Sequence, residues 1–169
     1  MTVLATSLMV LGLFAAEDAA PPAAPAQADC RGVEHRQFDF WIGEWEVSAQ
    51  GKPAGRNTIS AEQNGCVLRE EWRGASGLTG TSLNFYDRGD QRWHQVWIDG
   101  RGSVLRLSGS APQPGIMVLE SSPDAEGPRQ RIRWTLRVDG VVEQHWEQSS
   151  DQGVTWTTAF LGEYKPADI

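Results

Sequence analysis

The sequence has little positive charge and no run of basic residues. Its 169 residues include 15 Lys and Arg against 22 Asp and Glu, which gives a net charge of −7. Proteins that bind nucleic acids or anionic lipids concentrate positive charge on one surface. The scattered basic residues of this chain form no such run, so we expect no nucleic-acid partner.

Cysteine, histidine and catalytic motifs are also scarce. The chain has two Cys and three His, and neither type follows a zinc-binding spacing, so we expect no metal and no cofactor. It has no Gly-rich phosphate loop and no nucleophile elbow, so dinucleotide binding and serine hydrolase chemistry are not supported. In an oxidising compartment Cys30 and Cys66 would have one intramolecular pairing, which would tie the N-terminal segment to the third expected strand. The sequence leaves open whether they meet.

Apolar residues form one run, at residues 3–16, which is too short to span a bilayer as a helix. The run is typical of a signal peptide, and Ala26-Gln27-Ala28 fits a cleavage site. We therefore expect residues 1–28 to be removed, residues 29–169 to form one domain without a membrane-spanning segment, and the protein to be periplasmic or secreted. The alternative is an Ala/Pro-rich tail on a cytoplasmic protein, since no basic residue precedes Arg31.

From about residue 44 onward the hydrophobic pattern has a period of two and is broken by Gly, Asp, Asn and Pro, which predicts β-strands joined by turns. In 131–138 the residues Ile132, Trp134, Leu136 and Val138 share one face, which we expect to lie in the core. Asp139-Gly140, which follows, is a hairpin signal. We expect about ten strands, near 44–50, 55–62, 66–73, 80–87, 91–98, 102–109, 115–120, 129–138, 141–148 and 155–164.

No segment resembles a long amphipathic helix, so the fold class is all-β. Ten sequential strands would close into an antiparallel up-and-down barrel, because closure removes the exposed edges. A short helical turn within 33–41 would cover one end of the barrel with Phe38, Phe40 and Trp41.

Motifs along the chain resemble three known groups of proteins. Gly43-x-Trp45 at the start of the first expected strand resembles the lipocalin-like, or calycin, barrels, in which this Trp closes the base. The stretch Phe38 to Trp45 resembles a bacterial family of uncharacterised exported proteins, and further motifs extend that resemblance over most of 36–164. It implies a β-barrel and no established activity. A more distant similarity is to nitrobindin-type haem barrels, which bind iron through a His near the C-terminal end.

Three expected strands carry a polar residue two places before a Trp: Glu70-x-Trp72, Gln95-x-Trp97 and Gln144-x-Trp146. Residues two apart share a strand face, so each pair points the same way. Three arrangements are open: an apolar cavity with polar anchors, a filled core, or faces turned outward. We favour the cavity, which predicts binding of a small, largely apolar molecule, with Asn84 or Tyr86 joining from the neighbouring strand.

Two alternatives assign chemistry to single residues. Glu70 would act as a general acid or base if burial raised its pKa, which makes an enzyme the second hypothesis. His145 would bind haem if it faced inward, but it lies one residue from Trp146 and hence on the opposite face. We expect His145 in solvent, leave a homodimer open, and interpret Ser149-x-Asp151-x-Gly153-x-Thr155-Trp156 as an Asp-box turn with a structural role.

Overall fold

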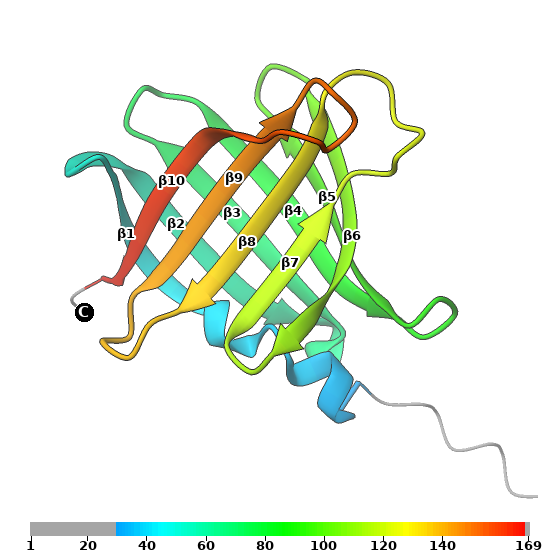
Figure 1. The fold of residues 1–169 in the computed structure, drawn as a ribbon. Coiled ribbons are helices and arrows are strands. Elements are labelled where there is room, and N and C mark those ends of the chain that lie inside the picture. Colours follow the sequence, from blue (N-terminus) through cyan, green and yellow to red (C-terminus); the bar gives the residue numbers. More distant parts are fainter. Residues whose placement is uncertain (1–29, 168–169) are drawn as a thin grey trace, which may run out of the picture.

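A computed structural model describes residues 30–167, which form a closed antiparallel β-barrel (Figure 1). The expected signal peptide and its cleavage site lie outside the described residues. None of the helices found in 30–167 is long and apolar enough to span a membrane.

Within residues 30–167, three short 3-10 helices accompany the barrel. η1 (Val33–Arg36) and η2 (Asp39–Trp41) precede it, and η3 (Gln63–Gly65) joins its second and third strands. The ten strands are β1 (Gly43–Ala49), β2 (Lys52–Glu62), β3 (Val67–Gly74), β4 (Thr79–Asp87), β5 (Arg92–Asp99), β6 (Val104–Gln113), β7 (Ile116–Glu120), β8 (Arg129–Leu136), β9 (Val142–Ser149) and β10 (Thr157–Pro166).

Each strand pairs with its neighbour in sequence, and β1 pairs with β10 to close the barrel. The closing register joins Trp45 to Pro166 and Val47 to Tyr164. This arrangement confirms the expected ten-stranded up-and-down barrel, and it is consistent with a lipocalin-like fold. Closure leaves no strand edge of the sheet unpaired, which is the physical reason a long meander adopts it.

The buried face of the eighth strand is shorter than the sequence pattern predicts. Ile132 and Trp134 are buried as expected, but Leu136 and Val138 are exposed. β8 ends at Leu136, and Val138 lies in the hairpin turn beyond it. The alternation therefore continues past the point at which the chain leaves the barrel wall, so we correct the expectation that Leu136 and Val138 belong to the core.

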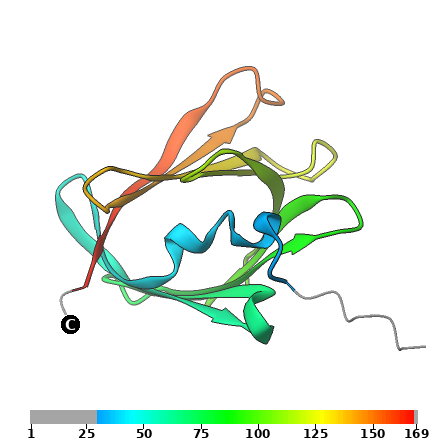
Figure 2. The same ribbon diagram turned by 90° about the horizontal axis from the view of Figure 1, so that it is seen from below.

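Residues 33–41 form the expected helical plug, and Figure 2 shows this segment lying across one end of the barrel. Phe38 and Trp41 have no exposed surface, and their rings stack with centroids 5.0 Å apart. Phe38 also contacts the rings of Trp93 and Trp134 on the barrel wall. Aromatic rings provide large apolar areas for burial, so this cluster seals what we call the plugged end.

The Gly-x-Trp motif joins the plug to the first strand. The indole Nε1 of Trp45 donates a hydrogen bond to the carbonyl oxygen of Trp41 across 2.9 Å. Gly43 has a φ of 150°, and a Cβ placed on it would lie 3.4 Å from the Trp45 ring. The glycine therefore permits both the backbone turn and the inward fold of the indole.

A disulfide between Cys30 and Cys66 fastens the start of the described chain beside the plug. Cys66 directly follows η3 and precedes β3, so the bond joins the N-terminal segment to the third strand of the barrel. The guanidinium of Arg36 adds a hydrogen bond to the carbonyl oxygen of Gly65. The pairing that the sequence left open is therefore present.

The Asp-box between β9 and β10 forms the expected turn. Asp151 accepts hydrogen bonds from the hydroxyls of Thr155 and Ser149 and from the backbone N–H of Thr155, and these bonds lower its pKa to about 2. The indole N–H of Trp156 donates to the carbonyl oxygen of Gly153 at 3.0 Å, and the Arg131 guanidinium lies 4.1 Å from the Trp156 ring. The motif therefore builds a loop, as the sequence predicts.

Candidate functional site

A cavity of about 360 Å³ occupies the barrel on the side away from the plug. It extends from the barrel interior to the loop residues Ser76 and Leu78 and to Asp99 at the end of β5. We call this second end of the barrel the mouth. All six residues of the three polar-x-Trp pairs line the cavity: Glu70, Trp72, Gln95, Trp97, Gln144 and Trp146.

The three pairs lie on strands β3, β5 and β9, which run in the same direction because alternate strands of an antiparallel barrel are parallel. Each of these strands ends at the mouth, as Figure 1 shows. In every pair the Trp lies two residues, or roughly 6.6 Å, nearer the mouth than its polar partner. The repeated spacing therefore builds two layers, a polar layer deep in the barrel and an indole layer above it.

Hydrophobic side chains complete the wall between these layers. Leu105 and Ile132 line the cavity from β6 and β8, and Phe160 lines it from β10. In the register, Leu105 lies opposite Trp97, and Phe160 lies opposite Trp146. The lining is thus mainly apolar with a few polar groups, which is the usual composition of a small-molecule site.

Glu70 is the centre of the polar layer. It is 5% exposed, and its carboxylate accepts two hydrogen bonds from residues on the strands flanking β3. Asn57 Nδ2 donates to Oε1 at 2.8 Å, and Ser82 Oγ donates to Oε2 at 2.6 Å. Burial raises the pKa of Glu70, and the bonds from Ser82 and Asn57 partly oppose that rise. Desolvation penalises the charged form, whereas donors to the carboxylate favour it.

A chain of side chains extends this layer across β4 to β5. Asn84 Nδ2 donates to the backbone carbonyl of Leu68 at 3.1 Å and to Ser82 Oγ at 2.9 Å. Gln95 Nε2 donates in turn to Asn84 Oδ1 at 2.9 Å. Buried polar groups in proteins are normally paired in this way, because an unpaired group would lose its hydration without compensation.

Tyr164 forms the other side of the polar layer. Its hydroxyl donates to Gln144 Oε1, and its ring contacts those of Trp41 and Trp45 at the plugged end. Burial and the nearby charge of Glu70 raise the pKa of Tyr164 well above its ordinary value. Tyr164 therefore stays neutral and connects the cavity to the aromatic cluster of the plugged end.

Glycines lie behind two of the three indoles of the upper layer, Trp72 and Trp97. A Cβ placed on Gly80 would come within 2.1 Å of Trp97 Cζ2, and one on Gly55 would come within 2.8 Å of the Trp72 ring. The Trp97 and Trp72 indoles therefore each lie against a strand at a point without a side chain. A side chain at either glycine would push the ring away from the wall.

Two predicted residues do not line the cavity. Asn84 is fully buried and contributes through its bond with Gln95 instead. Tyr86 lies toward the plugged end, where its ring contacts those of His35 and Trp93. Both share the inward phase of β4, but Asn84 is covered by its neighbours and Tyr86 is on the plug side of the polar layer.

Histidines do not contribute to the cavity lining within residues 30–167. His145 is half-buried, and its Nε2 is hydrogen-bonded to Thr158 Oγ1 at 2.9 Å, whereas its neighbours Gln144 and Trp146 line the cavity. This is the outward placement that strand alternation predicts, and it leaves the lumen without an imidazole ligand for haem iron.

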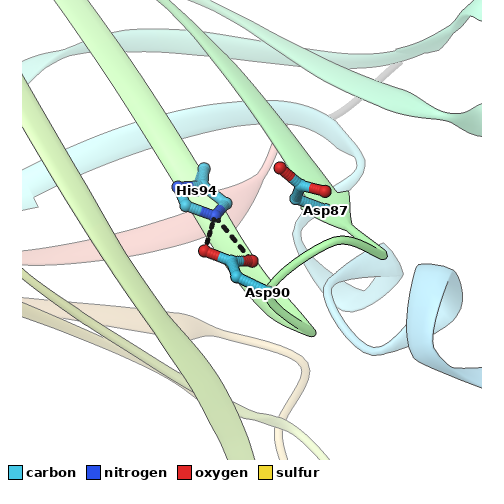
Figure 3. Close-up of side chains that lie close together, drawn as sticks. All are labelled: Asp87, Asp90 and His94. Atoms are coloured by element: carbon cyan, nitrogen blue, oxygen red, sulfur yellow. Dashed lines mark hydrogen bonds and ion pairs between the residues drawn. The ribbon is translucent and has the colours of Figure 1, made fainter.

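His94 also lies outside the cavity, near the hairpin that joins β4 to β5. Figure 3 shows it beside Asp90, whose carboxylate is 3.0 Å from His94 Nε2, with Asp87 nearby. One ligand atom from each of the three lies within 4.8 Å of the others. The two carboxylates already accept bonds from backbone N–H groups of their own turn, at Gly89 and Arg92. We therefore assign the cluster to the turn and assign no metal to it.

Sequence reasoning missed three polar residues of the site, Asn57, Ser82 and Tyr164. Asn57 lies two residues before the buried Ile59, and Ser82 lies two before Asn84, so both have the inward strand phase. This strand phase was the sequence signal that could have identified Asn57 and Ser82 as inward-facing. It does not reveal that the side chains of three strands meet at Glu70, because the pairing register is required for that inference.

Comparison of the chain with models of known protein families found no match, and comparison with curated proteins found none either.

Proposed function

We propose that the protein binds one small, largely apolar molecule in the barrel cavity. The observation that carries this proposal is the convergence of the three polar-x-Trp pairs on one cavity of about 360 Å³. Ligand sites commonly have volumes of about 300–1,000 Å³, mainly apolar walls and a few polar groups that orient the ligand. Glu70, Gln95 and Gln144 are the orienting groups, and the three indoles are the walls.

The division of the cavity into layers supports an orientation for the bound molecule. Its polar end would reach the deep layer, and its apolar body would lie among Trp72, Trp97 and Trp146 nearer the mouth. A filled core is the competing arrangement, and it would require side chains to occupy this volume.

The Cys30–Cys66 disulfide supports an exported location, because such bonds persist in oxidising compartments and are rare in the cytosol. We propose the periplasm or the extracellular medium as the place of function. Fractionation of cells that produce the full chain, followed by thiol labelling of each fraction, tests this location. Disulfide-bonded protein outside the cytoplasm is expected, and reduced protein confined to the cytoplasm would contradict it.

Blocking the cavity tests the binding function. Ala54 lines the cavity, so Ala54→Trp places an indole in the ligand volume. Thr58→Trp is the matched control, because Thr58 is exposed on the outward phase of the same strand. Purified proteins are titrated by calorimetry with a panel of small amphiphiles, and native mass spectrometry examines gently purified wild type for a retained molecule.

We expect wild type and Thr58→Trp to bind at least one panel member, and Ala54→Trp to lose that binding while its circular dichroism is unchanged. Wild-type protein that retains no molecule and binds no member of the panel would contradict the proposal. Equal binding by Ala54→Trp would place the ligand elsewhere.

A further inference from the structure

The ionisable groups that line the cavity are all acidic. Counted over residues 30–167, they are the carboxyl groups of Glu70 and Asp99 and the hydroxyl of Tyr164, with no Lys, Arg or His. Asp99 lies at the mouth, where hydrogen bonds from the Ser103 and Arg101 backbone N–H groups lower its pKa. A ligand therefore meets one carboxylate at the mouth and a second carboxyl at the deep layer.

The hydrogen-bond chain has a fixed direction that ends at Glu70. The Leu68 carbonyl can only accept, so it fixes Asn84 with its NH₂ group toward Leu68 and Ser82. Ser82 accepts from Asn84, which leaves its own hydrogen for Glu70 Oε2. Asn57 Nδ2 also donates to Glu70. The Ser82 hydroxyl and the Asn57 amide thus both point toward the carboxyl group, whose two oxygens accept from them.

Gln95 presents a second acceptor. Its Nε2 donates to Asn84, and its Oε1 has no hydrogen-bond partner among residues 30–167. Gln144 supplies a neutral donor, since its Oε1 accepts from Tyr164 and its Nε2 is left for the cavity. The deep layer therefore offers a carboxylate and a carbonyl to hydrogen-bond donors, against one neutral amide N–H₂ for acceptors.

The indole layer favours the same kind of ligand. Trp72, Trp97 and Trp146 lie two residues nearer the mouth than the polar residues of the deep layer. Aromatic faces attract cations through the ring quadrupole. Trp146 is held in place by a 2.7 Å hydrogen bond from its Nε1 to Gln130 Oε1. A cation on its way from the mouth to Glu70 therefore passes the indole layer.

We propose that the ligand is an organic amine in its protonated form, with an ammonium group on an apolar body. The inference rests on the proposed binding function and names its ligand class. The ammonium N–H groups donate to Glu70 and Gln95, and the body lies among the indoles. Anionic amphiphiles such as fatty acids are excluded, because their carboxylate would be desolvated beside Glu70 without a cation to balance it.

Ligands that share one body and differ in the head group test the inference. Octylamine, octyltrimethylammonium, 1-octanol and octanoate are titrated into the wild-type protein by calorimetry at pH 7.5. We expect octylamine to bind about tenfold or more tightly than 1-octanol, because a charged donor gains more from a buried carboxylate than a neutral one. Octanoate should bind most weakly. Octyltrimethylammonium keeps the charge without N–H donors and should fall between octylamine and 1-octanol.

Glu70→Gln removes the charge at the deep layer, and the ratio of octylamine to 1-octanol affinity should fall toward one. The matched control is Glu71→Gln, whose side chain pairs with Arg69 on the outward face of the same strand and which should keep the wild-type ratio. A cooperative thermal unfolding transition of each variant establishes that it is folded. If Glu70→Gln does not fold, the four-ligand series on the wild-type protein alone tests the amine assignment.

Two negative outcomes are distinguishable. Binding of 1-octanol or octanoate as tight as that of octylamine overturns the amine assignment and leaves a binding cavity. Absence of binding by all four ligands, together with no binding in the wider amphiphile panel, overturns the binding function itself.

Discussion

Asn57 donates a hydrogen bond from Nδ2 to Glu70 Oε1 across 2.8 Å, while its own Oδ1 is buried without a partner among the described residues. Rotation of the Asn57 carboxamide by half a turn would present Oδ1 to Glu70 instead. The pair can therefore satisfy either an ionised carboxylate, which only accepts, or a protonated acid, which donates.

We expect Glu70→Gln to stabilise the free protein at neutral and higher pH. Glutamine has no charge to desolvate, and after rotation Asn57 Oδ1 can accept from its NH₂ group while Ser82 donates to its oxygen. Because burial raises the folded-state pKa of Glu70 above the ordinary value of 4.5, the folded state holds the proton to higher pH than the unfolded state does.

The contribution of Glu70 to stability is therefore greatest below pH 4.5 and declines as pH rises toward the raised pKa. Urea unfolding of wild type and Glu70→Gln at several pH values measures this decline, which the variant should lack. Tyr164, the other titratable group near Glu70, stays neutral over this range. Parallel pH profiles of the two proteins would show that Glu70 is not the group responsible.

Amine binding should release protons from Glu70. A bound ammonium favours the ionised carboxylate, so the pKa of Glu70 falls on binding. Affinity for octylamine should thus increase with pH as free Glu70 ionises, and decrease once the amine loses its own proton. Asp99 at the mouth is already ionised in this range, because its hydrogen bonds lower its pKa.

Calorimetry in buffers with different ionisation enthalpies measures the number of protons released. A release in wild type that disappears in Glu70→Gln is expected. An equal release by both proteins would assign the proton to another group.

Gly80→Ala should move the Trp97 indole out of its place against β4. The added Cβ would lie 2.1 Å from Trp97 Cζ2, which is closer than non-bonded atoms tolerate. Overpacking of this kind costs about 1–3 kcal/mol of unfolding free energy. The displaced ring also enters the lumen, so octylamine affinity should fall.

The control for this prediction combines Gly80→Ala with Trp97→Leu, which removes the colliding ring. In a double-mutant cycle, the cost of Gly80→Ala should largely disappear in the Trp97→Leu background. Additive costs would indicate that Gly80 matters for a reason other than contact with Trp97.

Removing the disulfide should destabilise the barrel by about 2–4 kcal/mol, because the bond limits the freedom of the unfolded chain. Cys30 and Cys66 are 36 residues apart in sequence, so the closed loop is long. Denaturant unfolding of the Cys30→Ser/Cys66→Ser variant gives the difference. Wild-type protein in reducing agent should lose a similar amount, and an unchanged midpoint in both would show that the bond adds no stability.

The fold was largely predictable because the information is local. Period-two alternation indicates each strand, turn residues separate the strands, and a meander of this length has one way to remove its edges. The failures are at element ends: Leu136 is the last residue of β8 and Val138 lies in the turn beyond it, and there the hydrophobic pattern no longer reports burial.

The site was predictable in part. Glu70-x-Trp72 and its two counterparts needed only the rule that residues two apart share a face. Tyr86 and Asn84 obey the same rule, yet Tyr86 lies on the plug side, because phase gives the face of a strand and not the height along the barrel. The partners of Glu70 come from β2 and β4, and the sequence contains no register that would place Asn57 and Ser82 beside it.

The common direction of β3, β5 and β9 has a consequence for selectivity. An amine that enters with its charged head first leaves its tail toward Ser76 and Leu78, where the cavity reaches the mouth. Homologous amines of increasing chain length would then differ little in how their heads are held. Discrimination among guests would depend on the chemistry of the buried end and scarcely on overall size.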